Sequence, residues 1–431
     1  MAVQILERQL RSAPTTVTRM LDVDEARARI LAAFAPLPMV RVSLAEAMGS
    51  VLAVDVIAGG SVPAFPNAAM DGFALRAEET VGASSERPVR LRVIAEAAAG
   101  YESVAVVTSG TAIRIMTGAP VPAGADAVVR FEETDERTGA IRHGPGDTVA
   151  IGASARPGEN VRPIGEDVHA GETVLAAGTR VRPAEIGVLA TLNRTEVTVH
   201  RRPRVGVLAT GDEIVDAGEP LGPGQIRNSN APMLAALVSR CGGEAVALGT
   251  ARDTEADLCG CLAQADGLDL LLTTGGVSVG DYDLVKQVLQ AQGRIDLWEV
   301  RIKPGKPLAF GCVGRTPVLG LPGNPVAAAV AFEQFARPAI RKMLGHGCLE
   351  IPTVTARLEG RVENRGGRRH YVRVAVEASP QGYVARVAGG QGSGVLSTLA
   401  KANALLIIPE TLLVAEDGAL LPAQMLDWDL G

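Results

Sequence analysis

The chain has 431 residues, too many for one compact domain, and its 47% hydrophobic content can build several cores. The net charge of -6 gives no reason to expect a nucleic-acid partner. No apolar run reaches the roughly 18 residues of a membrane helix, and the N-terminal segment lacks the apolar core of a signal peptide. The five cysteines include one close pair, Cys259 and Cys261, with no histidine nearby. We therefore expect free thiols in a cytoplasmic protein with no membrane partner.

The first part of the chain predicts a mixed framework domain with an insertion. Amphipathic or short apolar patterns predict helices at 21–34, 44–52 and 184–192 and a strand at 54–57. Short Val- and Ile-rich strands alternate with glycine turns over residues 75–152, which is typical of a small β-rich module. The composition of the following segment resembles the start of the chain more than this module. We interpret residues 63–153 as an inserted domain that divides a framework domain into 20–62 and 154–198.

From Arg204 onward, strands alternate with helices, which predicts a doubly wound α/β domain over residues 199–345. Expected strands lie near 205–209, 244–248, 268–272, 295–300, 308–310 and 318–321, and expected helices at 233–241, 253–265, after Asp283, and from Pro325 to about Leu344. Asn324 suits the N-cap of that last helix and Pro325 its first position. Residues 346–431 return to short strands and predict a β-barrel or sandwich.

The stretch 268–283 is a buried strand that ends in Thr-Thr-Gly275-Gly276 before a helical pattern. In open α/β sheets ligands bind at the carboxyl ends of strands, where glycines let the backbone approach an anion. Asp281 and Asp283 follow this turn, and carboxylates beside an anion site suit a bridging divalent cation. Helix capping is the ordinary alternative for these aspartates.

Two other strands end in similar turns, Thr210-Gly211-Asp212-Glu213 and Pro322-Gly323-Asn324, and the same sheet edge should carry them all. Lys303 and Lys306 flank a Pro-Gly pair, a rigid cationic corner that suits phosphate or another oxyanion, although either could be an ordinary solvated lysine. Four carboxylates complete the set: Glu213, Asp253, Asp281 and Asp283. The pattern predicts Mg²⁺-assisted chemistry on a phosphorylated ligand. Neither a P-loop nor a strand-linked G-x-G-x-x-G occurs.

Seven motifs occur in order along the chain. They are Asn67-Ala-Ala-Met-Asp71-Gly-Phe-Ala, Met116-Thr117-Gly-Ala, Gly165-Glu-Asp167, Thr210-Gly-Asp-Glu213, Gly275-Gly-Val-Ser278-Val-Gly with Asp283, Lys303-Pro-Gly-Lys306-Pro307, and Gly320-Leu-Pro-Gly-Asn-Pro325. Together they resemble the molybdopterin molybdenumtransferase family, bacterial relatives of the molybdate-inserting domain of gephyrin. Taken without this resemblance, the ordinary interpretation of Asp71 before Gly72 is a turn former.

The resemblance, which runs from about residue 20 to the C-terminus, implies an elongated framework domain, an inserted lid, the α/β domain and a C-terminal β-domain. It implies a homodimer whose active site joins the α/β domain of one subunit to the lid of the other. The implied reaction takes adenylylated molybdopterin and molybdate, with Mg²⁺ assisting, and releases AMP and the molybdenum cofactor. Molybdate and tungstate have nearly the same size and charge, so the motifs fit either oxyanion.

The resemblance also implies roles for individual residues. The expected catalytic residues are Asp71, Thr117, Asp167, Glu213, Asp253 and Asp283, of which Glu213, Asp253 and Asp283 would also hold the metal. The expected substrate-binding residues are Gly211, Asp212, Gly275, Gly276, Ser278, Lys303, Lys306, Pro307, Pro322, Gly323 and Asn324. Three positions depart from the family's usual residues: Ala68 replaces Ser, Phe73 replaces Tyr, and Ala327 replaces a Ser whose hydroxyl could contact molybdate.

Two other functions are compatible with parts of the sequence. An enzyme that makes the adenylylated pterin uses a related α/β domain, but the motif around Asp71 and the Lys-Pro-Gly-Lys loop argue against it. A scaffold that has kept the fold without turnover is a third class, and the intact set of acidic residues argues against that reading.

Overall fold

The computed structural model describes residues 20–101, 103–275, 288 and 293–426. The chain divides into two compact units. Of the described residues, those within 20–54, 177–186 and 196–426 form the larger unit, and those within 55–176 and 187–195 form the smaller unit. Over the described ranges, none of the helices has both the length and the apolar character needed to cross a membrane.

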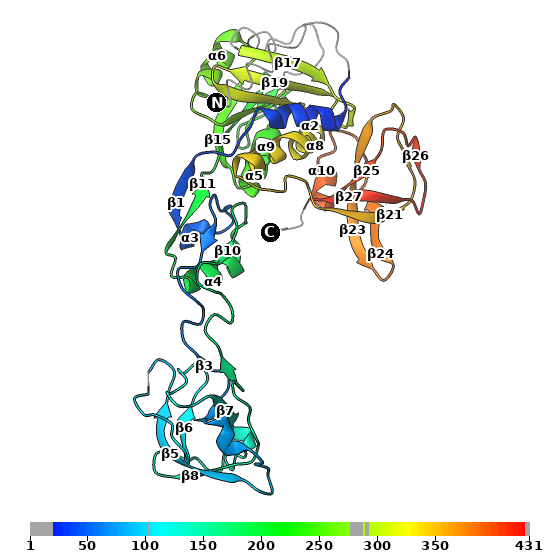
Figure 1. Cartoon of the computed structure of the whole chain (residues 1–431). Coiled ribbons are helices and arrows are strands. Elements are labelled where there is room, and N and C mark those ends of the chain that lie inside the picture. Colours follow the sequence, from blue (N-terminus) through cyan, green and yellow to red (C-terminus); the bar gives the residue numbers. More distant parts are fainter. Residues whose placement is uncertain (1–19, 102, 276–287, 289–292, 427–431) are drawn as a thin grey trace. The chain divides into compact units, whose positions relative to one another are not determined.

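A six-stranded sheet forms the centre of the larger unit (Figure 1). Its order is β15 (Glu244–Ala251), β12 (Arg204–Thr210), β16 (Leu270–Thr274), β20 (Thr316–Leu321), β19 (Pro307–Val313) and β17 (Gly293–Glu299). All neighbours are parallel except β19, which is antiparallel to β20 and β17. Only Gly314 and Arg315 separate β19 from β20, and so short a connection requires antiparallel strands. The amino end of β19 therefore lies at the same edge as the carboxyl ends of the other five.

Helices cover both faces of this sheet, as the sequence predicted. The helices α2 (Val23–Ala32), α5 (Asn230–Arg240), α8 (Pro325–Ala331) and α9 (Arg337–Met343) contribute to one core, and α6 (Glu255–Ala263) contributes to the other. Successive strand residues point to opposite faces, so Leu270 and Leu272 enter the first core while Leu271 enters the second. The sheet is thus buried on both faces, so groups that contact a ligand have to lie at its edges.

The long helix expected after Pro325 is interrupted by a π-helical turn at Phe332–Ala336. Pro338 explains this turn, because it has no N–H to donate to the carbonyl of Gln334 and would clash with it in a regular helix. Arg27 Nε of α2 donates to that freed carbonyl at 3.2 Å. Two other helix starts differ from expectation. Helix α5 begins three residues earlier than predicted, and α6 begins at Glu255, after Thr254 rather than at Asp253.

The C-terminal region is a closed five-stranded barrel, which decides between the two expected β architectures. Its order is β23 (Arg369–Ser379), β24 (Gly382–Val387), β21 (Thr353–Glu359), β27 (Leu420–Met425) and β25 (Ala404–Ile408), closed by β23 against β25. Strand β23 is long enough to pair with β25 through its first half and with β24 through its second. This stagger is what closes a sheet into a barrel. A two-residue strand, β18 (Ile302–Lys303), adds to β23.

The smaller unit contains the expected β-rich insertion together with part of the expected framework domain. Its five-stranded sheet has the order β7 (Ala127–Arg130), β4 (Gly72–Leu75), β6 (Thr111–Ile115), β5 (Val89–Ala97) and β8 (Thr148–Ile151). Gly72 begins β4, and a Cβ at this position would meet the carbonyl oxygen of Val129 at 2.0 Å. The close approach of β4 to β7 therefore requires glycine directly after Asp71.

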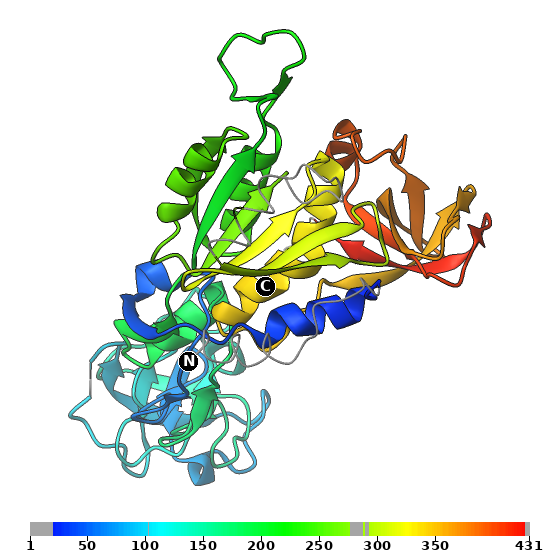
Figure 2. The ribbon, with the colours of Figure 1, turned by 90° about the horizontal axis from the view of Figure 1, so that it is seen from above.

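The remaining elements are short. They are β1 (Met39–Ser43), which pairs with β11 (Glu196–His200), α3 (Leu44–Ala47), β2 (Val56–Ile57), β3 (Asn67–Ala68), η1 (Ala77–Thr80), η2 (Phe131–Glu133), β9 (Val161–Arg162), β10 (Thr173–Leu175), α4 (Pro183–Thr191), β13 (Ile214–Val215), β14 (Ile226–Arg227), β22 (Val362–Glu363), α10 (Ser397–Lys401) and β26 (Val414–Ala415). Strand β1 was missed, and the expected helix at 44–52 is shorter than predicted. Figure 2 shows the green segment between β13 and β14 projecting from the α/β domain.

Candidate functional site

A pocket of about 550 Å³ lies at the edge of the sheet where β12, β16 and β20 end and β19 begins. Its lining residues come from the strand-end turns, the start of α5, the β18–β19 turn and one loop of the C-terminal barrel. They are Ala209, Thr210, Glu213, Ile214, Ile226, Arg227, Asn228, Ser229, Asn230, Thr274, Gly275, Gly305, Lys306, Pro307, Pro322, Gly323, Asn324, Pro325, Ala327 and Ser393. The expected meeting of the strand-end turns at one edge is thus observed.

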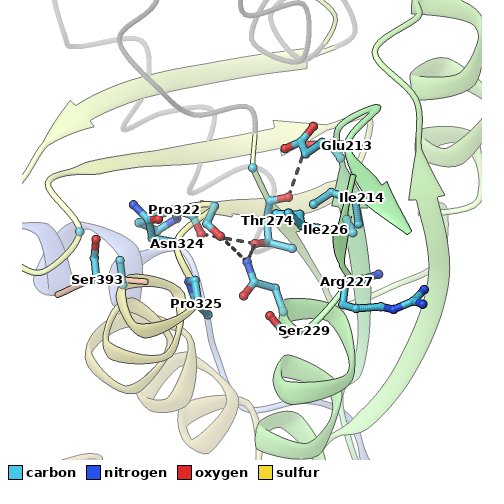
Figure 3. Close-up of a pocket in the computed structure, with 18 of the residues that line it drawn as sticks. Glu213, Ile214, Ile226, Arg227, Ser229, Thr274, Pro322, Asn324, Pro325 and Ser393 are labelled. Carbon is cyan, nitrogen blue, oxygen red and sulfur yellow. Dashed lines mark hydrogen bonds between the residues drawn. The ribbon is translucent and has the colours of Figure 1, made fainter. Parts of the chain in front are cut away.

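Hydrogen bonds around Thr274 tie three of these segments together (Figure 3). Asn230 Nδ2 donates to Thr274 Oγ1 and to the carbonyl of Gly323, each at 2.7 Å. The Thr274 hydroxyl donates in turn to the carbonyl of Pro322 at 3.3 Å. Both side chains are buried, so bonds lost here would leave polar groups without water to replace them. This network is a preorganised floor that links β16, β20 and α5.

The glycine after β16 is required by its surroundings. Gly275 has a φ of +95°, and a Cβ there would lie 2.8 Å from the carbonyl oxygen of Thr210. A side chain would therefore push apart the turns that follow β12 and β16. Because only glycine fits this close contact, Gly275 in the sequence correctly indicated where the site lies.

Three carboxylates gather beside the pocket, although only Glu213 lines it. The backbone N–H of Asp253 donates to Asp212 Oδ1 at 3.1 Å. Burial raises the pKa of Asp253 above its ordinary value, and the nearby charges of Asp212 and Glu213 add to the rise. Thr254 caps α6 by accepting from the N–H of Asp257, so Asp253 is not needed as the cap.

Like charges held this close favour a cation, because the repulsion between them is relieved when one binds. Within the ranges that the structure describes, however, no three acidic, His or Cys side chains form a ready-made metal site. Four of the residues predicted for this edge, Gly276, Ser278, Asp281 and Asp283, lie outside the described residues, so the predicted metal set is described only in part.

The two lysines expected to form one cationic corner line different pockets. Lys306 lines the main pocket, and its Nζ lies 2.7 Å from Glu299 Oε1. Lys303 lies in β18 beside His370 of β23, and both line a second pocket of about 610 Å³ next to the barrel. Burial lowers the pKa of Lys303, and the charge of Arg368 adds to this. The separation arises because β18 joins the barrel while β19 joins the α/β sheet.

In the smaller unit, Asp71 and Thr117 are in direct contact. Asp71 Oδ1 accepts from the backbone N–H and from the hydroxyl of Thr117, each at 2.7 Å. The antiparallel register of β4 and β6 produces this contact, because it pairs Gly72 with Ile115. The N–H of Thr117, and then its hydroxyl, hold the pKa of Asp71 below its ordinary value. Asp71 is therefore a fixed, exposed carboxylate at neutral pH.

Asp167 lies in the same unit but on a different turn. Its backbone N–H donates to the carbonyl of Val62 at 3.0 Å, and its side chain is exposed. The three departures from the family pattern are all buried, with exposures of 0% for Ala68, 0% for Phe73 and 2% for Ala327. Phe73 packs edge-on against Phe131, so the aromatic ring at this position fills a core.

Sequence reasoning missed several pocket residues. Asn228 and Asn230 precede and begin α5, and their positions before a helix were a cap signal that could have drawn attention to them. Asn228 Oδ1 does accept from the N–H of Ala231, at 3.1 Å. Ser393 had no such signal, because it comes from the distant barrel; its carbonyl accepts from the N–H of Val326 at 3.1 Å.

Comparison with known proteins agrees with this arrangement along the chain. Residues 21–193 match the MoeA N-terminal region (domains I and II), residues 206–342 a probable molybdopterin binding domain, and residues 355–425 the MoeA C-terminal region (domain IV). A molybdopterin molybdenumtransferase 2 of Mycobacterium tuberculosis is 41% identical over 398 residues, which cover 91% of this chain and 95% of that protein. The chain belongs to the molybdopterin molybdenumtransferase (MoeA) family.

Further relatives support the membership in this family. A molybdopterin molybdenumtransferase of Haemophilus influenzae is 35% identical over 395 residues, covering 91% of this chain and 95% of that protein. The crystal structure of a molybdopterin biosynthesis MoeA protein from Pyrococcus horikoshii superimposes with a TM-score of 0.80 at 32% identity, covering 94% and 100% of the two chains. The predicted family and multidomain fold are confirmed. MoeA proteins are transferases of molybdenum cofactor biosynthesis, and this chain is one of them.

Proposed function

We propose that this MoeA protein inserts molybdate into adenylylated molybdopterin and releases AMP. The observation that carries the proposal is the strand-edge pocket in the region that matches a molybdopterin binding domain. Its volume of about 550 Å³ is within the usual range for a cofactor-sized ligand. Lys306 and Arg227 line it with positive side chains and Glu213 with a negative one. This combination suits a ligand that carries phosphate and needs charge balance.

The acidic residues support a role for Mg²⁺ in this reaction. Glu213 and Asp253, together with Asp283, would hold the ion. Burial first, and then the charges of Asp212 and Glu213, raise the pKa of Asp253, which fits a site that a cation would neutralise. Bound Mg²⁺ would neutralise negative charge on the phosphoanhydride as it breaks. Gly211, Gly275 and Gly323 would let the backbone of their turns lie close to the phosphates, above the floor that Asn230 and Thr274 form.

Lys303 and Lys306 would receive the oxyanion and the pterin phosphate. Molybdate is a dianion, and an anion beside other anions is stabilised only if cations are close. Lys303 is partly buried, which lowers its pKa, and an ionic contact is stronger where water is partly excluded. Because the two lysines line different pockets, we propose that they contact different substrates, or that they contact the same substrate at different steps of its binding.

The homodimer remains a proposal that derives from the family resemblance. In such a dimer, Asp71, Thr117 and Asp167 of one subunit would complete the site of the other. A mixing experiment tests this arrangement. Variants Asp71→Asn and Asp253→Asn, each inactive alone, should regain activity when subunits are exchanged, because one site of each heterodimer has both residues intact. No recovery from subunits shown to exchange would contradict it, and light scattering that finds only the 44.6 kDa species would exclude the dimer.

A direct assay tests the reaction itself. The protein is incubated with adenylylated molybdopterin, molybdate and Mg²⁺, and AMP and active cofactor are measured together. We expect AMP release that depends on molybdate and matches cofactor formation one to one. Synthesis of the adenylylated pterin from molybdopterin and ATP would instead support an adenylyltransferase, and absence of both products would support a scaffold. We also propose a cytoplasmic location, which the five free cysteines support.

A further inference from the structure

The ion pair between Glu299 and Lys306 places a carboxylate beside the main cation of the pocket. Glu299 ends β17 and pairs with Pro307 of β19, while the N–H of Val300 donates to the carbonyl of Lys306 at 2.8 Å. The side-chain atoms Glu299 Oε1 and Lys306 Nζ are 2.7 Å apart. Lys306 lines the pocket, and Glu299, which pairs with its ammonium group, does not.

No second described cation can replace Lys306 in this pocket. Arg227 also lines it, but its guanidinium donates to the carbonyl oxygens of Asp216 and Glu219 and extends away from Thr274 (Figure 3). Across the described ranges, Glu299 is the carboxylate within ion-pair distance of Lys306. The charge that the pocket offers an anion therefore depends on how strongly Glu299 neutralises Lys306.

We propose that Glu299 is a counter-ion that an incoming oxyanion must compete with, and that it sets the affinity of the pocket for a tetrahedral dianion. Two effects of the carboxylate oppose each other. It holds the lysine side chain in place, and it repels the second anion that approaches the same ammonium group. Lys306 is 39% and Glu299 22% exposed, and ion pairs this exposed contribute little to positioning. Repulsion of a doubly charged ligand is larger, so removal of the carboxylate should tighten binding.

The backbone at Glu299 is held independently of its side chain, which makes the residue suitable for substitution. Its carbonyl accepts from the N–H of Leu21 at 2.8 Å, and the N–H of Arg301 donates to the carbonyl of Leu21 at 2.8 Å. Glu299→Gln keeps the shape of the side chain and an oxygen that can accept from Lys306. The fold should therefore survive the change, which a thermal melt verifies.

The experiment measures oxyanion binding by isothermal titration calorimetry with molybdate, and in separate titrations with inorganic phosphate and AMP. Glu299→Gln should lower the dissociation constant for molybdate by roughly threefold to tenfold. Glu299→Asp, which keeps the negative charge, should have a dissociation constant close to that of the wild type. The gain should shrink at high salt and disappear in a Glu299→Gln/Lys306→Ala double variant. A gain for AMP but for neither molybdate nor phosphate would assign the effect to the nucleotide, and would overturn the oxyanion assignment.

Glu244→Gln is the matched control. Glu244 begins β15, at the opposite edge of the same sheet, and pairs with Arg204 at 3.8 Å. Its substitution changes the net charge by the same amount as Glu299→Gln, but at a position away from the pocket. Unchanged or weaker molybdate binding in Glu299→Gln would overturn the proposal, as would an equal gain in Glu244→Gln.

The role of the oxyanion as substrate rests on the proposed function, and turnover separates the two claims. If the wild-type protein shows no molybdate-dependent AMP release, the proposed function fails while the titrations still decide the role of Glu299. If it does turn over, Glu299→Gln should lower KM for molybdate with little change in kcat. A fall in kcat alone would indicate a structural role.

Discussion

The strand-edge pocket of the larger unit and the Asp71–Thr117 contact of the smaller unit are built in different ways. The pocket collects short segments from residue 209 to residue 393, and its floor depends on side chains that meet only after the sheet has formed. The Asp71 site needs one pair of neighbouring strands and two hydrogen bonds to a single carboxylate oxygen. A change in the pocket floor should therefore affect stability and binding together, whereas a change at Asp71 should affect activity with little effect on stability.

The largest expected effect comes from Asp71→Asn, which separates activity from stability in the smaller unit. We expect AMP release to fall by about 100-fold or more, as for loss of a positioned catalytic group. The free energy of unfolding should change by less than about 1 kcal/mol, because the carboxylate is exposed. Steady-state kinetics and thermal melts at pH 7 measure both. Raising the molybdate concentration should not restore the rate, and rescue by molybdate would assign Asp71 to oxyanion binding instead.

Asn230→Ala is the corresponding change in the larger unit. It removes two hydrogen bonds and leaves the Gly323 carbonyl and the Thr274 hydroxyl without this partner. We expect the free energy of unfolding to fall by about 1–3 kcal/mol, with weaker binding of the substrate. Chemical denaturation and binding titrations test this. Ser239→Ala, in the same helix but on its exposed side, is the control, and equal losses in both variants would show that the network has no special role.

Substitution of Lys303 and of Lys306 compares the contributions of the two pockets of the larger unit. Lys303→Ala and Lys306→Ala should each weaken molybdate use by about 1.5 kcal/mol, roughly tenfold in half-saturation, and high molybdate should compensate in part. Lys306→Ala should have the larger effect, because it also leaves the Glu299 carboxylate unpaired beside the pocket. A molybdate titration of AMP release measures both variants. Wild-type half-saturation in both would show that they are ordinary surface lysines.

The pH dependence of stability should differ between the barrel and the smaller unit. Burial lowers the pKa of His370 to about 3, and Lys303 and Arg373 contribute to the shift. Between pH 6.5 and 3 the unfolded chain therefore binds a proton at His370 that the folded chain does not. Stability from this group is complete above pH 6.5 and should fall by about 1.4 kcal/mol per pH unit below it. In denaturation measured at several pH values, His370→Gln should flatten this slope, and an unchanged slope would contradict the assignment.

The smallest effect belongs to Asp71 and lies in another pH window. Its pKa is lowered from 3.8, so its contribution is present above pH 3.8 and is lost as the pH falls through the lower folded value. Because the carboxylate is exposed, this contribution should be under about 1 kcal/mol. Comparing melts of the wild type and Asp71→Asn at pH 7 and pH 3 checks it. A difference that grows toward low pH would have the wrong sign for a depressed pKa.

Local patterns were sufficient to predict several parts of this molecule. The apolar run at 268–272, the alternation of strands and helices after Arg204, and the Pro at the start of the helix at 325 each depend on neighbours in the sequence, and each is observed. Glycines 72 and 275 were informative for the same reason, since only glycine tolerates the close backbone contacts found there. The motifs also predicted the family, because they occur in order over nearly the whole chain.

Tertiary structure alone decided how the charged groups are distributed. Spacing placed Lys303 and Lys306 together, but β18 joins the barrel and β19 joins the α/β sheet, so the two ammonium groups line different pockets. The partner of Lys306, Glu299, and the barrel residue Ser393 reach the pocket region only through sheet pairing and domain packing. A sequence pattern reports the conformation that each segment prefers. The distances between charges far apart in the chain depend on register and packing, and those distances determine the electrostatics of the site.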